Sequence, residues 1–173
     1  MQVLEYWTAV TVDRSDLLTR LIGLLDAQGV RYCVIGGQGV NAYVDPLVSL
    51  DLHLAVATAD LPRVRELLAN AFQIEVAPQG VNVSAPDSAL RVQFQTDARY
   101  APFVDRASRR MVLGMDLPVA RVEDLLDGKT WAAMDPSRRP SKRQKDLADI
   151  ARLLEAYSAL RAAVPPEIMA RLL

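Results

Sequence analysis

The clearest pattern of hydrophobic and polar positions runs from Tyr32 to Ala57. An apolar run at 33–35 predicts a buried strand, which Gly36–Gly37 ends. A second run then alternates strictly, because successive side chains of a strand point to opposite faces. Leucines and a valine occupy one face, and the other face carries Ser49, Asp51, His53 and Ala55. Asp51 and His53 therefore project together beneath the glycine turn, an arrangement typical of a functional site.

Helical and strand-like periodicities divide the rest of the chain. Leucines and an isoleucine at helical spacing predict a packing helix over 13–28, with Asp13 or Ser15 as its cap and Gly29 after its end. Further helices are expected at 58–71, 100–110 and 122–134, and in an amphipathic stretch that buries Leu147, Ile150, Leu153 and Leu154. Alternating positions predict strands at 31–35, 49–56, 73–76, 81–83, 90–95 and 111–113.

These elements predict an α/β (α+β) fold, in which helices pack on a mixed β-sheet of about four to six strands. The length of 173 residues suits one domain that buries a real core. We expect an α/β core over 1–120 and a helical C-terminal part over 121–173, packed on that core as a single structural domain.

Composition and charge narrow the possible functions. The chain is 51% hydrophobic and 24% charged, which is typical of a globular protein. Its net charge of −1 gives no overall attraction to nucleic acid, so such binding would need a local basic patch. The single cysteine, Cys33, lies in an apolar run and is expected in the core, without a disulfide framework. Without a membrane-length apolar run or a signal-like N-terminus, the sequence predicts a cytoplasmic protein with no membrane partner.

The order of a strand, Gly36–Gly37, a short helix and a strand with two polar residues one position apart resembles the nucleotidyltransferase superfamily, whose fold is shared with the polymerase beta catalytic domain. In that family the two glycines lie against the phosphates of the nucleotide, and paired carboxylates hold one or two divalent metals. Gly36, Gly37 and Asp51 match this pattern. His53 stands where the family has its second carboxylate. The resemblance is closest to small AbiEii-type toxin-like relatives, and it implies a minimal nucleotidyltransferase fold with a degenerate metal motif.

A second match lies near the other end of the chain. AbiEii-type relatives carry a helix with a lysine and then a basic stretch that ends in Lys-Asp-Leu-x-Asp-Ile; here Lys129 is followed by that motif at 145–150. The resemblance implies that lysines of this region meet nucleotide phosphates or an RNA backbone, and that an acidic partner orients the lysine or orders the helix. Asp146 and Asp149, three residues apart, are neighbours on the helix surface.

The resemblance implies a set of site residues. The expected nucleotide-binding residues are Gly36, Gly37, Gln38, Lys129, Lys142 and Lys145, and the expected catalytic residues are Asp51, His53 and Lys145. Asp51 and His53 are the expected ligands of Mg²⁺ or another divalent metal. An imidazole suits zinc, nickel or manganese better than magnesium, which prefers oxygen ligands. The third carboxylate of active relatives is missing from the strand at 90–95, and Asp97 is its nearest substitute.

Two functional hypotheses follow. In the first, the protein transfers a nucleoside monophosphate from a nucleoside triphosphate to RNA or a protein, and a cognate antitoxin exists. In the second, the fold is catalytically degenerate and acts as a nucleotide-binding or protein-interaction module. A third hypothesis, a small α/β domain with an unrelated ligand, stays open. The glycine pair also fits a tight turn, Asp51 fits a solvated residue, and His53 fits a hydrogen-bonded histidine. The basic residues over 138–145 also fit a solvated helix entry.

Overall fold

A seven-stranded mixed sheet forms the centre of the computed structural model, which describes residues 16–172. The strand order is β3-β4-β5-β2-β1-β7-β6. β2 pairs with β1 in antiparallel fashion and with β5 in parallel, and β1 also pairs in parallel with β7. The bounds are β1 (Tyr32–Ile35), β2 (Asp51–Val56), β3 (Gln73–Ala77), β4 (Gly80–Ser84), β5 (Arg91–Gln95), β6 (Ser108–Val112) and β7 (Met115–Val119). The predicted α/β fold is confirmed, and the sheet is one strand larger than the expected range.

The C-terminal hairpin of the sheet accounts for the difference. The helix expected over 100–110 is the 3-10 helix η2 (Ala98–Arg106), and the residues after it form strand β6, which pairs with β7. Leu113 and Gly114 connect these strands, and both have positive φ, 52° and 80°. Two-residue hairpin turns with positive φ are usually recognised from Asn-Gly or Asp-Gly. A leucine in the first position hides this turn, so the second strand of the hairpin was not predicted.

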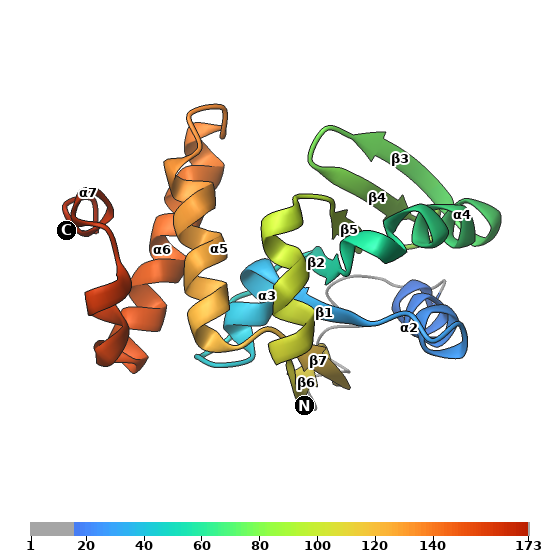
Figure 1. The fold of residues 1–173 in the computed structure, drawn as a ribbon, viewed down its shortest axis with the longest axis horizontal. Coiled ribbons are helices and arrows are strands. Elements are labelled where there is room, and N and C mark those ends of the chain that lie inside the picture. The colour runs from blue at the N-terminus through green and yellow to red at the C-terminus, as the bar shows by residue number, and fades with distance from the viewer. Residues whose placement is uncertain (1–15, 173) are drawn as a thin grey trace.

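Helices flank the sheet at both ends (Figure 1). α2 and α4 lie beside one end of the sheet, while α5 and α6 lie side by side at the other, with η2 between the sheet and α5. The helical bounds are α2 (Leu17–Ala27), α3 (Gly36–Asn41), η1 (Thr58–Asp60), α4 (Leu61–Ala71), α5 (Val122–Met134), α6 (Pro140–Ala156), η3 (Ser158–Ala163) and α7 (Pro166–Met169). The helix predicted over 13–28 ends before Gly29 as expected; its proposed caps, Asp13 and Ser15, lie outside the described residues.

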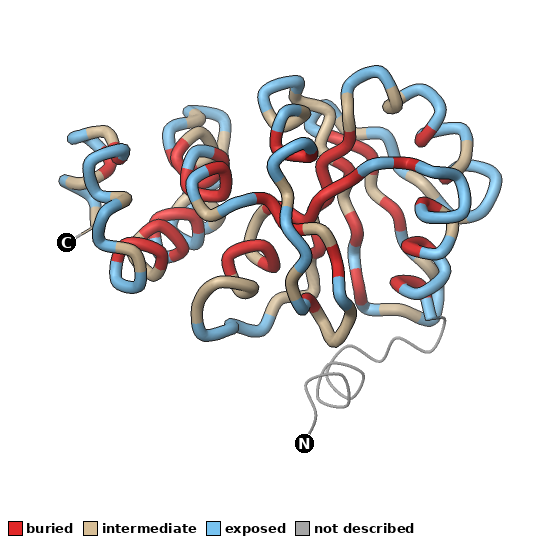
Figure 2. The backbone as a smooth tube through the Cα atoms, turned by 60° about the horizontal axis from the view of Figure 1, so that its bottom comes forward, coloured by how far each residue is buried: buried red, intermediate tan, exposed pale blue. Residues whose placement is uncertain are grey.

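The hydrophobic core joins the sheet to both sets of helices. Figure 2 shows buried backbone running through the strands and recurring on the helices at the far end. Leu52 and Leu54 of β2 are fully buried, as the alternation predicts. The four apolar positions expected on the last long helix are buried too, and they are Leu147, Ile150, Leu153 and Leu154. This packing fixes α6 against the rest of the molecule, so its polar face has a defined position. No helix within residues 16–172 is long and apolar enough to cross a membrane.

Candidate functional site

A cleft between strand β2 and helix α6 brings together most of the polar residues that the sequence singles out. Its lining includes Gly37, Asp51, His53, Lys129, Lys142 and Lys145. Asp51 and Lys142 are 91 positions apart in the chain, yet the Lys142 ammonium lies 3.4 Å from the Asp51 carboxylate. The two parts of the motif therefore meet in the folded protein. They do so because α6 packs its apolar face inward and turns its charged face toward β2.

The glycine turn lies directly against His53. Gly36 follows β1 and has φ 68°, a left-handed conformation that favours glycine. Because β1 and β2 are antiparallel with Ile35 opposite His53, a Cβ on Gly36 would lie 3.1 Å from Nδ1 of His53. Two features therefore favour glycine at this position: the left-handed backbone and the closeness of the imidazole. Gly37 lies on the other side of the turn, where a Cβ would be 3.9 Å from Oδ2 of Asp149.

Asp51 is held between two cations from different elements. The parallel register of β2 and β5 sets Arg91 beside it, and the Arg91 Nε atom lies 2.8 Å from Oδ1 of Asp51. Lys142 contacts the other carboxylate oxygen, Oδ2. Partial burial would raise the pKa of Asp51, but Arg91, Lys142 and His53 outweigh it and hold the pKa below its ordinary value. Asp51 is therefore an ionised carboxylate with both oxygens engaged.

His53 is a neutral imidazole in a ring of positive charge. Burial lowers its pKa to about 4, and the nearby Lys129, Arg138 and Lys142 act in the same direction. Asp51 opposes this shift without overcoming it. At neutral pH the side chain therefore has one donor and one acceptor nitrogen and no charge.

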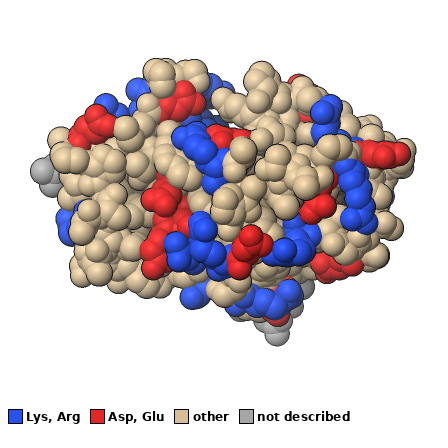
Figure 3. Space-filling view, viewed as in Figure 1, with Lys and Arg blue, Asp and Glu red and all other residues tan. Residues whose placement is uncertain are grey.

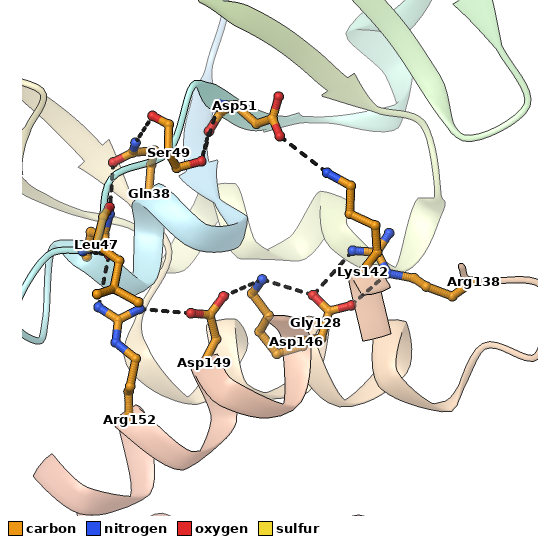
Figure 4. Close-up of polar contacts among 12 residues, drawn as sticks. Gln38, Leu47, Ser49, Asp51, Gly128, Arg138, Lys142, Asp146, Asp149 and Arg152 are labelled. Carbon is orange, nitrogen blue, oxygen red and sulfur yellow. Dashed lines mark hydrogen bonds and ion pairs between the residues drawn. The ribbon is translucent and has the colours of Figure 1, made fainter. Parts of the chain in front are cut away.

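A network of ion pairs lies beneath this pair of residues (Figure 4). Asp146 and Asp149 project from one face of α6 because they are three residues apart. The ammonium of Lys129, on α5, lies 3.0 Å from the first and 2.7 Å from the second. Arg138 also pairs with Asp146 at 2.6 Å, and Arg152 pairs with Asp149 at 2.8 Å. The side chains of Lys129, Asp146 and Asp149 are nearly buried. Together with Arg138, they connect α5, α6 and the segment between the two helices.

The same network orders the connection between α3 and β2. Arg152 donates to Oδ1 of Asn41 at 3.0 Å and to the carbonyl of Asp45. The Asn41 amide in turn bonds both the N–H and the carbonyl of Leu47, at 3.0 and 2.7 Å. Gln38 is buried, and its side-chain amide donates to the carbonyl of Ser49 at 2.9 Å. Gln38 therefore holds this loop through its side chain, and the nucleotide contact expected for it stays a prediction.

Lys145 differs from the other cations of the cleft. Its side chain is exposed, and within residues 16–172 it has no hydrogen bond or ion pair. Lys129, in contrast, is engaged by two carboxylates. Three lysines were expected to meet phosphates, and their contacts differ. Lys145 is unpaired within the described residues, Lys142 contacts Asp51, and Lys129 belongs to the buried network. The catalytic role expected for Lys145 stays a prediction.

A wider groove of about 700 Å³ opens next to the cleft, over the polar face of β2, β5, β4 and β3. Asp51 and His53 form its inner end, and Arg138 and Lys142 form one wall. Cross-strand pairing places Asn82 opposite Gln93 and Gln93 opposite His53, so a row of polar side chains crosses the floor. On the face seen in Figure 3, basic side chains lie beside acidic ones rather than in one broad basic patch. This face therefore carries no continuous basic surface.

The residues present do not fit a divalent metal, which the family resemblance implies. Asp51 already has a cation on each oxygen, and Lys129 and Arg138 add two more near its neighbour His53. No group of three or more His, Cys, Asp or Glu side chains within residues 16–172 could hold a metal ion. Magnesium is usually held by one or two carboxylates together with substrate phosphates and water, and here both oxygens of the one carboxylate are already paired with cations.

The third carboxylate is also absent from the fold. Strand β5 runs beside β2, where a third acid would have to lie, and it presents Arg91 and Gln93 opposite Asp51 and His53. Asp97, the nearest substitute, follows the strand and pairs with Arg99 at 2.7 Å. An arginine and a glutamine, rather than an acid, thus face Asp51 and His53 from β5.

Sequence reasoning missed two residues of the site. Arg91 lies on the strand predicted at 90–95, but only the parallel pairing of β2 and β5 shows that it contacts Asp51. Arg152 lies past the recognised motif, and its spacing of three residues from Asp149 was the available signal. Both contacts depend on tertiary packing.

Comparison with known proteins identifies a family and related folds. The model of the family described as "Nucleotidyl transferase AbiEii toxin, Type IV TA system" matches residues 50–172. No curated protein matches the sequence.

Among solved structures, the antibiotic-resistance factor ANT(2'')-Ia is 15% identical with a TM-score of 0.57, over 86% of this chain and 89% of its own. The lincosamide antibiotic adenylyltransferase LnuA is 15% identical with a TM-score of 0.53, over 83% and 99%. A nucleotidyltransferase-like antigenic protein from Paracoccidioides brasiliensis is 15% identical with a TM-score of 0.50, over 94% of both chains. These similarities establish a shared fold.

Proposed function

The chain belongs to the AbiEii family of nucleotidyl transferase toxins of type IV toxin–antitoxin systems, and on that premise we propose that its cleft binds the phosphates of a nucleoside triphosphate directly through cationic side chains. In this proposal the protein is a nucleotide-binding module of the nucleotidyltransferase fold. Metal-dependent transfer at Asp51 and His53 is not part of it.

The charge around Asp51 and His53 is the observation that carries the proposal. Arg91 and Lys142 each contact one oxygen of Asp51, and His53 contributes no charge of its own. Lys145 adds an unpaired ammonium in the part of the chain that the structure describes. A site with this charge attracts an anion and repels a divalent cation. Phosphate oxygens form strong charge-assisted hydrogen bonds with such side chains.

The shape of the site supports a ligand of nucleotide size. Lys142 and Lys145 lie on one wall of the cleft, and the groove beside it measures about 700 Å³. Small-molecule sites are generally about 300–1,000 Å³. Amide side chains of Asn82 and Gln93 line the groove floor and can both donate to and accept from a base or ribose. We therefore place the phosphates in the cleft and the nucleoside in the groove.

Nucleotidyl transfer itself is the second candidate. It is favoured by the retention of Asp51 in the cleft that Gly37 also lines, and LnuA, which shares the fold, is an adenylyltransferase. In that case an RNA or protein acceptor is expected. For either candidate the family description leads us to expect a cognate antitoxin, and the demand for nucleoside triphosphates suggests a cytoplasmic location.

Thermal unfolding with ATP, CTP, GTP and UTP, each with magnesium and with EDTA, tests the proposal. A ligand at about 100 times its Kd stabilises the folded state by about 2.7 kcal/mol, which raises Tm by about 5–10 °C for a chain of this size. We expect at least one nucleotide to give the same rise under both conditions. Lys145→Gln should reduce the rise, whereas Arg65→Gln, which removes an exposed cation on α4, should leave it unchanged.

Two results would contradict nucleotide binding without metal. A rise in Tm that requires magnesium, together with labelled product in a transfer assay, would favour the transferase. The lack of any rise with all four nucleotides would reject both candidates.

A further inference from the structure

The ion pairs of the site fall into two classes that differ in exposure. Lys129 and its partners Asp146 and Asp149 have side chains that are at most 11% exposed. The pairs of Asp51 are open to solvent, since the Arg91 and Lys142 side chains are 68% and 40% exposed. Exposed ion pairs contribute little to stability and exchange partners readily, whereas buried pairs are costly to break. The contacts of Asp51 are therefore the ones that a ligand can replace.

Asp51 is also the only acidic residue common to the cleft and the groove beside it, among the residues that line them. Asp51 bridges Arg91 on the sheet and Lys142 on α6, and all three residues line the groove. Both cations are therefore already paired with its carboxylate. A carboxylate with a cation on each oxygen is ionised at neutral pH. An ionised carboxylate in that place repels an incoming phosphate as well as occupying its partners.

We infer that Asp51 is a built-in counter-anion, which holds Arg91 and Lys142 until the phosphates of a ligand displace it. The binding site is thus a polyphosphate site made of Arg91, Lys142 and Lys145, and Asp51 competes with the ligand. This inference rests on the proposed function and assigns Asp51 a role opposite to that of a metal-binding aspartate. Removing its carboxylate makes the ligand bind more tightly.

The long contact between Lys142 and Asp51 explains how a ligand can displace Asp51 without disrupting the fold. Its ammonium contacts Asp51 at 3.4 Å, longer than a typical charge-assisted hydrogen bond of about 2.7–2.9 Å. Arg138, the neighbouring cation on the same wall, contacts the buried Asp146 at 2.6 Å instead. A phosphate therefore meets one loosely held cation and one firmly held cation. The loosely held one is free to turn toward the ligand while α6 stays in place.

Isothermal titration calorimetry with inorganic tripolyphosphate and with ATP, both in EDTA, tests the inference. For Asp51→Asn we expect binding tighter than wild type by about 3- to 10-fold, as exposed ion pairs are replaced by contacts to the ligand. The matched control is Asp97→Asn, because Asp97 pairs with Arg99 in a similarly exposed setting at a neighbouring cavity. That variant should bind as wild type does.

A double variant tests whether the tighter binding depends on Lys142. Adding Lys142→Gln to Asp51→Asn should cancel most of the gain, since the released cation is then missing. Asparagine matches aspartate in size, and circular dichroism checks that each variant is folded.

The outcomes separate the two proposals. If the wild-type protein binds and Asp51→Asn binds equally or more weakly, the counter-anion role is overturned and nucleotide binding is left intact. Absence of binding by both proteins overturns the proposed function and this inference together. Tighter binding by Asp51→Asn with unchanged Asp97→Asn supports both.

Discussion

His53 illustrates how position sets the chemistry of a single residue. On the alternation of β2 it looks like a substitute for a carboxylate, but in the fold it lies against the Gly36 backbone and near three cations. Burial, and then these cations, disfavour a positive charge on the imidazole, so it stays neutral. Its closeness to Gly36 explains why no larger residue fits the turn. The residue therefore acts as an uncharged wall of the cleft.

The depressed pKa of His53 predicts a dependence of stability on pH. The folded state has a pKa of about 4 and the unfolded chain about 6.5, so the unfolded chain binds the proton first. The stabilising contribution of the neutral imidazole is complete above about pH 6.5 and is lost as the pH falls toward 4. His53→Gln should remove this part of the slope, and urea unfolding at several pH values measures it. His53 is the only histidine in the sequence, so equal slopes for the two proteins would contradict the prediction.

The left-handed backbone of Gly36 predicts the effect of a methyl group. Gly36→Ala should lower the free energy of unfolding by about 1–2 kcal/mol, because an L-residue is strained at positive φ. Crowding of His53 adds to this cost. Gly23→Ala is the control, since Gly23 lies in helix α2 with no atom within 4 Å of the added Cβ, and it should stabilise by about 0.5–1 kcal/mol. Equal effects of the two changes, measured by urea unfolding, would contradict the assigned conformation.

At the scale of elements, buried charge holds the two long helices in register. Lys129 on α5 contacts Asp146 and Asp149 on α6, and Arg138 and Arg152 complete the pairing of these acids. The apolar face of α6 fixes its distance from the core, and this network fixes which residues face β2. The family motif that suggested phosphate-binding lysines thus includes a lysine whose contacts are structural.

Lys129→Met tests this structural role. Two carboxylates would lose their shared buried cation, which should lower the free energy of unfolding by about 3–5 kcal/mol. Arg109→Gln is the comparison, because the Arg109–Asp116 pair is 63% and 58% exposed and its loss should change the free energy of unfolding little. Chemical denaturation measures both variants. A cost for Lys129→Met as small as that for Arg109→Gln would show that the network does not hold the helices.

At the scale of the whole molecule, the site exists only after folding. Strand β2 contributes Asp51 and His53, and helix α6 brings Lys142 and Lys145 from the far end of the chain. The fold is shared with ANT(2'')-Ia and LnuA, while the charge of the cleft departs from the paired carboxylates that the family resemblance implies. The placement of the proposed ligand therefore rests on the residues of this chain.

Local patterns predicted the elements better than the contacts between them. Alternation over 49–56 identified β2, and helical spacing identified the buried face of α6. The position of Arg91 beside Asp51 could not be predicted, because it depends on a parallel register between β2 and β5. The burial of Lys129 could not be predicted either, since a lysine in a motif looks the same whether a carboxylate or a phosphate faces it.

A crystal structure with a non-hydrolysable ATP analogue and excess magnesium tests the central claim most directly. We expect phosphate oxygens within hydrogen-bond distance of Lys142 and Lys145, and Asp51 no longer in contact with Lys142. A magnesium ion held by Asp51 and His53 against the phosphates, or a nucleotide bound away from this cleft, would contradict the account.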